Sequence, residues 1–181
     1  MKLIMRTFLA ITGFSITLLA STTFAQSASS PPEFSDYSVQ TYSGKLRIPS
    51  YYVKSGDVWR DDMGKEVSPP KVNLAGRYYV GVHSCGTECR YFTLSDLTTG
   101  NDSKALDIFS SDGEHPPKTK DGRTYVTVLA TRPDSRMLVA QYHIEKSESK
   151  PEECHERVFL LGEDGKGVTP ITATINQCQS K

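Results

Sequence analysis

Cys85 and Cys89 are the residues whose type and spacing offer the clearest chemistry in this chain. They bracket Gly86-Thr87-Glu88, so a disulfide between them would close a small ring. Such a ring has little conformational entropy left to lose on binding. Gly86 permits a positive φ, and Glu88 offers a carboxylate at the tip. We predict that Gly86, Thr87 and Glu88 bind a partner. An equally supported alternative is that the disulfide only stabilises the hairpin.

Zinc binding is a second hypothesis for the residues around the cysteine pair. His83, Cys85 and Cys89, together with the distant His155, have the ligand types of tetrahedral zinc sites. The spacing corresponds to no specific finger pattern, however, and cysteines in an oxidising compartment pair with each other. The sequence therefore predicts no metal site and no cofactor.

Catalytic residues are not predicted either. An even count of four cysteines leaves no spare thiol to act as a nucleophile. The Gly-x-Ser-x-Gly motif of serine hydrolases does not occur. Asp61-Asp62 and Glu152-Glu153 are adjacent carboxylates, which would point apart on a strand. These residues do not indicate an enzyme, and they do not exclude one.

Residues 1–25 have the features of a secretory signal peptide. Lys2 and Arg6 give a positive start, Thr7–Ala20 is mostly apolar and uncharged, and small residues precede Gln26. The apolar run of about 14 residues is shorter than the roughly 20 that cross a bilayer. We expect cleavage after Ala25, no membrane anchor afterwards, and a periplasmic or extracellular protein.

The four cysteines all follow the predicted cleavage site, which favours two disulfides. Three pairings are open, and we favour Cys85–Cys89 and Cys154–Cys178 because a glycine-containing turn lies between the members of each pair. The 21 basic and 21 acidic residues balance, and no basic block stands out. Nucleic acid is therefore not an expected partner.

Alternating apolar and polar residues predict an all-β fold. Tyr78 and Val80 should lie on one face of a strand, with Tyr79 and His83 on the other. We expect a flexible leader over residues 26–45 and a single β domain over residues 46–181. A short strand is expected at Ala105–Phe109 after a turn at residues 98–102, and a long surface loop at Ser111–Gly122.

An internal repeat links two of the predicted hairpins. Arg77-x-x-Val80 followed by Arg90-x-Phe92-x-Leu94 corresponds to Arg136-x-x-Val139 followed by Arg157-x-Phe159-x-Leu161. The pattern looks like β-propeller blades, but two copies do not make a full propeller. Antiparallel sheets in a β-sandwich or a partial propeller of two blade-like repeats, stapled by disulfides, are therefore expected.

The element Ser84-Cys-Gly-Thr-Glu-Cys89 resembles a Cys-Gly-Thr-x-Cys motif of secreted, uncharacterised bacterial proteins. The resemblance extends over residues 73–100 and 131–139, although His83-Ser84 replaces the Trp-Gly that often precedes the first cysteine there. It implies a secreted β-rich domain and no particular activity.

These features lead us to expect a secreted, non-enzymatic domain that binds a protein of the cell envelope, for example as an inhibitor or immunity-type partner of a cell-wall hydrolase. One alternative is an envelope hydrolase or carbohydrate-binding domain that uses Tyr78, Tyr79 and Tyr91. Another is a structural component of the envelope. The sequence indicates no oligomeric state.

Overall fold

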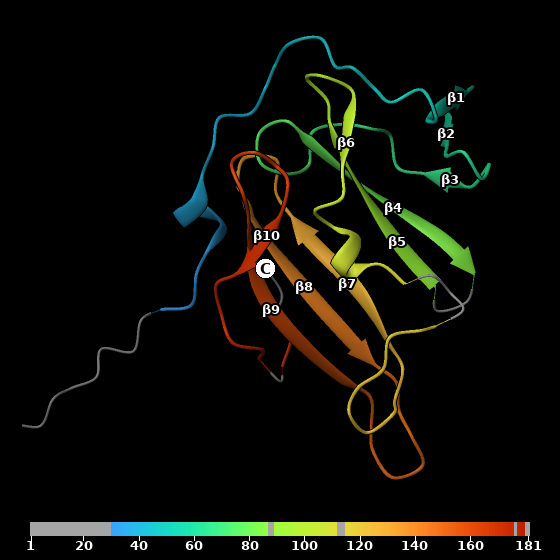
Figure 1. The fold of residues 1–181 in the computed structure, drawn as a ribbon, viewed down its shortest axis with the longest axis vertical. Helices are drawn as coiled ribbons and strands as arrows, with labels where there is room; N and C mark the ends of the chain where they lie inside the picture. Colours follow the sequence, from blue (N-terminus) through green and yellow to red (C-terminus); the bar gives the residue numbers. More distant parts are fainter. Residues whose placement is uncertain (1–29, 87–88, 112–114, 176, 180–181) are drawn as a thin grey trace, which may run out of the picture. The chain divides into compact units, whose positions relative to one another are not determined.

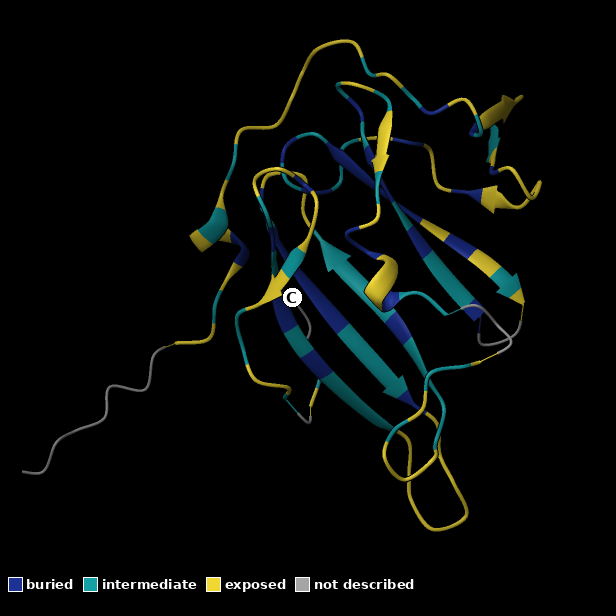
Figure 2. Cartoon of the chain, viewed as in Figure 1, coloured by how far each residue is buried: buried dark blue, intermediate teal, exposed yellow. Residues whose placement is uncertain are grey.

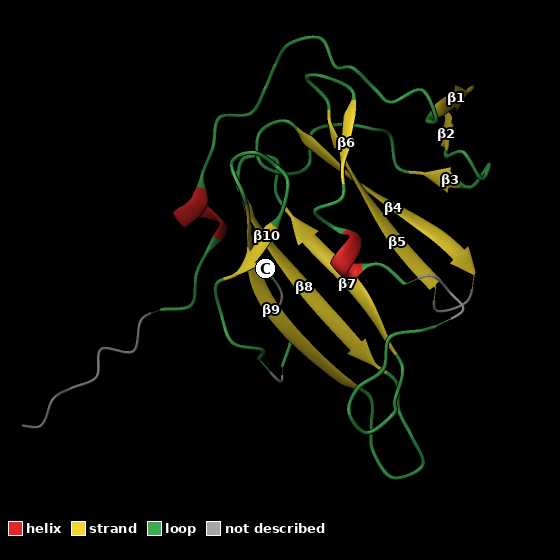
Figure 3. Cartoon of the chain, viewed as in Figure 1, coloured by secondary structure: helices red, strands yellow, loops and turns green. Residues whose placement is uncertain are grey.

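The computed structural model describes residues 30–86, 89–111, 115–175 and 177–179. The predicted signal peptide, residues 1–25, lies outside the described residues. Within the described ranges the strands form three antiparallel sheets without a closed barrel, joined by loops and two short 3-10 helices (Figure 1; Figure 3). The predicted all-β class and antiparallel pairing are confirmed.

Each sheet is a meander, in which strands that follow one another in the chain pair with each other. The first sheet contains β1 (Val53–Ser55), β2 (Val58–Arg60) and β3 (Glu66–Val67). The second contains β4 (Tyr78–Gly86), β5 (Cys89–Asp96) and β6 (Asn101–Ser103). The third contains β7 (Tyr125–Thr131), β8 (Met137–Ile144), β9 (Glu153–Leu161) and β10 (Val168–Pro170). The helices are η1 (Phe34–Tyr37) and η2 (Asp107–Phe109).

The main core lies between the second and third sheets, and stretches of β4, β8 and β9 are coloured as buried in Figure 2. One face of the β4–β5 hairpin packs against one face of the β8–β9 hairpin, and η2 adds to this cluster. Its principal buried side chains are Tyr78, Val80, Phe92, Leu94, Leu106, Phe109, Leu138, Phe159 and Leu161. Removing this apolar surface from water is the main force that holds the two sheets together.

The opposite face of β4 is covered as well, as the alternating pattern predicts. Tyr79 packs with Tyr52, Val67 and Leu97 in a separate cluster, so the first sheet and the segment before it shield the second sheet. The second sheet therefore has an apolar layer on each side of the first half of β4. The second half of β4 is more exposed.

Part of the segment predicted to be a flexible leader packs onto the third sheet. Phe34 is 6% exposed and contacts Met137, Val139 and Val158. The hydroxyl of Ser135 donates a hydrogen bond to the carbonyl of Phe34 (2.7 Å). The packed domain thus includes residues before the boundary expected at residue 46, because a large aromatic side chain there covers the outer face of β8 and β9.

The strand predicted at Ala105–Phe109 is wrong. Asp96 Oδ1 accepts hydrogen bonds from the amide and hydroxyl of Thr98, and the tight turn that results lets the chain pair again as β6 at residues 101–103. The following residues then form η2, which buries Phe109 and leaves Ile108 67% exposed.

The two hairpins of the internal repeat carry equivalent ion pairs. Arg77 pairs with Asp96 (3.3 Å) at the start of the first copy, and Arg136 pairs with Glu163 (3.4 Å) at the same place in the second. The strand registers differ, however. Val80 lies opposite Leu94 and faces the main core.

The corresponding Val139 lies opposite Val158 rather than Leu161, a shift of three residues. An odd shift turns a side chain to the other face of a strand, and Val139 accordingly packs against Phe34. The two copies therefore share a hairpin and an ion pair, but their strands pair in different registers.

Candidate functional site

Both predicted disulfides are present. Cys85 and Cys89 are joined with a Cα–Cα distance of 5.1 Å, and Cys154 and Cys178 with one of 5.4 Å, each within the usual range for a disulfide. The first closes the end of the β4–β5 hairpin and is called the clamp below. The second ties the C-terminal segment to β9. No free cysteine occurs in the part of the chain that the structure describes.

Of the three predicted partner-binding residues, Gly86 is described. It is exposed and has a φ of 142°, a conformation that other residues rarely adopt. Thr87 and Glu88 lie outside the described residues. The register between β4 and β5 shifts between Ser84 and Gly86, so a bulge precedes the turn.

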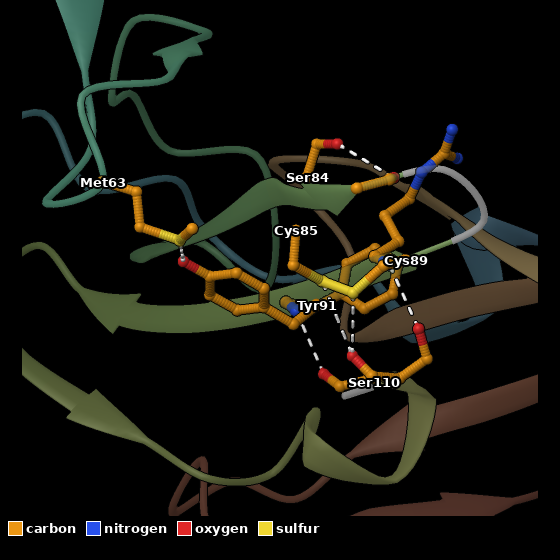
Figure 4. The surroundings of a disulfide bond; sticks show 10 residues. Met63, Ser84, Cys85, Cys89, Tyr91 and Ser110 are labelled. Atoms are coloured by element: carbon orange, nitrogen blue, oxygen red, sulfur yellow. Dashed lines mark hydrogen bonds between the residues drawn. A yellow bond between two sulfur atoms is a disulfide. The ribbon is translucent and has the colours of Figure 1, made fainter. Parts of the chain in front are cut away.

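The clamp rests on the segment that begins the long loop predicted at Ser111–Gly122 (Figure 4). The amide of Phe92 donates to the hydroxyl of Ser110 (3.0 Å). The amide of Ser111 donates to the carbonyl of Arg90 (2.8 Å), and the amide of Arg90 donates to the hydroxyl of Ser111 (3.2 Å). Ser110 and Ser111 thereby occupy the edge of β5 that faces away from β4.

A hollow of about 500 Å³ lies beside the clamp. The clamp contributes Cys85, the second sheet contributes Tyr91, and the far wall comes from residues at either end of η2 and from the loop after it, namely Asp107, Ser110, Ser111, His115 and Pro117. The clamp and the long loop, two separate features of the sequence, therefore border a single surface.

The other edge of β4 is open. Val80 shows which way its backbone points, because its amide donates to Asn73 Oδ1 (2.6 Å) and its carbonyl accepts from Asn73 Nδ2 (3.0 Å), both away from β5. Backbone direction repeats every second residue in an antiparallel pair, so the N–H and C=O groups of Val82 and Ser84 point the same way. None of the described residues bonds to these groups. Val82 is 49% exposed and Ser84 is exposed.

A buried polar network, which the sequence reasoning missed, lies behind this edge. His83 Nδ1 donates to Asp61 Oδ2 (2.8 Å), since a carboxylate can only accept, and both side chains are almost fully buried. His83 Nε2 lies 3.0 Å from Thr93 Oγ1 and 3.1 Å from the hydroxyl of Tyr52. The same hydroxyls lie 2.8 Å from each other.

Asp61 also organises the turn between β2 and β3. Its Oδ1 accepts from the amides of Met63 (3.1 Å) and Lys65 (2.8 Å). Burial raises the pKa of the Asp61 carboxyl, but the hydrogen bonds from His83 and from these amides outweigh burial, so the net pKa lies below its usual value. The turn motif Asp61-Asp62-Met63-Gly64 was visible in the sequence, yet its histidine partner lies 22 residues away.

The connection Asp61–His83–Thr93 has the order of an acid–base–hydroxyl triad. The His83 side chain is 1% exposed, however, and its Nε2 is already engaged by two hydroxyls. A substrate cannot reach the imidazole in this arrangement. The network joins the first and second sheets, and it supports Tyr91 at the surface beside the clamp.

Tyr91 connects the buried network to that surface. Its ring stacks on His83 with centroids 4.5 Å apart, and its hydroxyl donates to Met63 Sδ (3.5 Å; Figure 4). Burial raises the pKa of Tyr91, and the carboxylates of Asp62 and Asp61 raise it further. Tyr91 therefore remains an uncharged hydroxyl at neutral pH beside the hollow.

Tyr78 and Tyr79 do not form the tyrosine-bearing surface considered for carbohydrate binding. They are 4% and 2% exposed. Arg77 donates to the Tyr78 hydroxyl (2.8 Å), and the Tyr79 hydroxyl donates to the carbonyl of Ser68 (2.8 Å). Of the three tyrosines, Tyr91 alone reaches the surface in part.

The zinc ligands that were considered as an alternative do not come together as a site. Cys85 and Cys89 are oxidised and His83 binds Asp61, and no other cluster of potential metal ligands occurs among the described residues. Among the described residues, no helix is long and apolar enough to span a membrane. No family model, curated protein or solved structure matches this chain.

Proposed function

We propose that this protein is a secreted, non-enzymatic binding domain of the cell envelope, and that an extended segment of a protein partner pairs with the open edge of β4. The observation that supports the proposal is the row of backbone groups at Val82 and Ser84, next to the clamp, to which none of the described residues bonds. Two disulfides are typical of proteins in an oxidising compartment, which supports a location outside the cytoplasm.

An exposed strand edge is a template for another strand, and soluble proteins usually guard it with lysine, proline or a covering segment. The third sheet follows this rule at one edge, because β10 ends in Pro170. The stretch Val82–Gly86 contains neither lysine nor proline. A partner strand would gain main-chain hydrogen bonds from this edge, and pockets beside it would select its side chains.

The clamp holds this edge in place. It fixes the end of β4, and the hydrogen bonds of Arg90 and Phe92 to Ser110 and Ser111 fix the other side of β5. A rigid edge loses little conformational entropy when a partner binds. Glu88, which lies between Cys85 and Cys89 in the sequence, is proposed to offer its carboxylate to the same partner, for which a cell-wall hydrolase is our candidate class.

Replacement of Val82 by proline tests the edge. Proline removes the outward N–H, which the native sheet does not use, and it is tolerated at such positions of edge strands. We expect the affinity for a partner captured from an envelope extract to fall tenfold or more. Val82→Thr, which keeps the N–H and the preference for a strand, should bind like the wild type.

Both variants are melted in parallel with the wild type. If Val82→Pro does not fold, Val82→Lys provides the same test through an edge charge. Glu88→Ala should weaken binding by about 2 kcal/mol if a partner group is left buried and unpaired. Equal affinities of wild type, Val82→Pro and Val82→Lys would place the binding surface elsewhere and refute strand addition.

A further inference from the structure

A second cavity, with a volume of about 290 Å³, adjoins the hollow beside the clamp, because Ser110 and Pro117 line both. The third sheet packs on the second sheet with one face. Farther along the strands, the same face carries the polar and aromatic residues that line this cavity. Its floor comes from β7, β8 and β9, and η2 with the loop after it forms the opposite wall. The cavity is lined principally by Phe109, Tyr125, Thr127, Tyr142, His155 and Arg157.

Polar groups converge on this cavity without protein partners. Thr127 is 5% exposed, and none of the described residues hydrogen-bonds to its hydroxyl or to the hydroxyls of Tyr125 and Tyr142. The two tyrosine rings meet edge to face, with centroids 5.6 Å apart. Among the described residues, Glu156 Oε1 is the buried side-chain atom that lacks a partner. The three hydroxyls are therefore accessible within the cavity, where solvent or a ligand can bond to them.

Arg157 supplies the cation. Its Nε donates to the carbonyl of Thr172 (2.9 Å), and the guanidinium lies over the ring of Phe159 at 5.7 Å. These contacts orient the side chain and use one of its five N–H groups. No carboxylate among the described residues forms an ion pair with Arg157, whereas the neighbouring His155 is paired with Glu153 (3.2 Å).

Charge and shape together define the ligand class. None of the described residues bonds to the terminal N–H groups of Arg157, and such groups match the two oxygens of a carboxylate in a bidentate pair. The aromatic walls of Tyr125, Tyr142 and Phe109 suit an apolar or aromatic body. The volume lies at the low end of the range for small-molecule sites, so the ligand has about one ring.

We propose that this cavity is a binding site for a small organic carboxylate with an aromatic or apolar body. The carboxylate lies against Arg157, and the hydroxyls of Thr127 and Tyr142 bind polar atoms of the ligand. The cavity shares Ser110 and Pro117 with the hollow beside the clamp, but its ligand-binding groups come from the third sheet, and the proposal does not depend on the proposed partner.

The test uses the mature protein labelled with ¹⁵N and titrated with benzoate, with benzamide as the neutral isostere. Benzoate should shift the amides of Thr127, Tyr142 and Arg157, and benzamide should bind at least tenfold more weakly because it lacks the charge. Tyr142→Phe keeps the ring packing and should weaken benzoate binding about threefold to tenfold. Arg157→Gln should abolish the preference for benzoate over benzamide.

Arg132→Gln is the matched control, because Arg132 lies over Phe34 on the outer face of the third sheet (4.7 Å). It removes the same charge away from the cavity and should leave benzoate binding unchanged. If Arg157→Gln does not fold, the Tyr142→Phe titration and the comparison with benzamide still decide the question. Equal binding of benzoate and benzamide, or shifts confined to residues outside the cavity, would overturn the proposal.

Discussion

His83 Nδ1 lies 2.8 Å from Asp61 Oδ2, and the two buried side chains join β4 to the turn after β2. Through Asp61 the hydrogen bond also reaches the amides of Met63 and Lys65, and through the imidazole ring it reaches Tyr91. The first sheet is small, and its longest strands have three residues. This polar contact adds to the apolar packing of Val67 against Tyr79 and Leu97, which also holds the first sheet on the second.

Asp61→Asn should destabilise the protein by roughly 2–4 kcal/mol, because an amide nitrogen would replace an oxygen that accepts from a buried donor. The effect depends on pH. The pKa of Asp61 is lowered by folding, so its contribution to stability is present above the unfolded-state pKa of about 3.9 and is lost as the pH falls through the folded-state pKa.

Urea unfolding between pH 7 and pH 2 measures this effect. The difference in unfolding free energy between wild type and Asp61→Asn should be largest near neutral pH and should narrow at acidic pH. Asp62→Asn is the control, since Asp62 is the exposed neighbour, and it should change stability by no more than about 0.5 kcal/mol. A difference that stays constant with pH would contradict a role for the ionised carboxylate.

Gly81→Ala should also be destabilising, because the network fills the space above this residue. A Cβ at position 81 would meet the hydroxyl of Tyr52 and would lie 2.6 Å from Thr93 Oγ1. We expect a loss of about 1–3 kcal/mol from overpacking, measured by thermal melting. Gly167→Ala, whose Cβ would meet no atom within 4 Å, should be nearly neutral. Equal effects of the two substitutions on Tm would show that the network can rearrange around a Cβ at position 81 without loss of stability.

The two disulfides should contribute unequally. On the loop-entropy model, Cys154–Cys178 adds roughly 3 kcal/mol and Cys85–Cys89 nearer 2 kcal/mol, because the first spans 24 residues and the second spans 4. Replacement of both Cys154 and Cys178 by alanine should lower Tm more than replacement of both Cys85 and Cys89. A reversed order would indicate that the clamp does more than close a short turn.

The pattern of the strands could be predicted from the sequence because the alternation of β4 is a local property. Tyr78 and Val80 on one face, with Tyr79 and His83 on the other, follow from the period of two. Both disulfides followed from an even cysteine count and the intervening turns. The strand expected at Ala105–Phe109 failed because Ala105, Leu106 and Phe109 are buried by a 3-10 turn, which a short apolar run does not distinguish from a strand.

The contents of the site were harder to predict, because they depend on contacts between distant residues. Asp61 and His83 looked like a turn residue and a possible metal ligand, and nothing local indicates that they meet. The open edge at Val82 and Ser84 depends on which strands lie beside β4, which only the sheet order reveals. The cavity at Arg157 likewise brings together β7, β8, β9 and the segment around Phe109.

Site-specific photo-crosslinking tests the central claim, strand addition at β4, most directly. A photoreactive phenylalanine analogue is placed at Ser84 on the open edge of β4, or at the exposed Thr169 on β10 as the matched control, and each protein is illuminated with the captured partner. We predict that the Ser84 variant forms a covalent adduct whose peptide map identifies an extended partner segment, and that the Thr169 variant does not. Equal cross-linking from both positions, or cross-linking from Thr169 alone, would contradict the account.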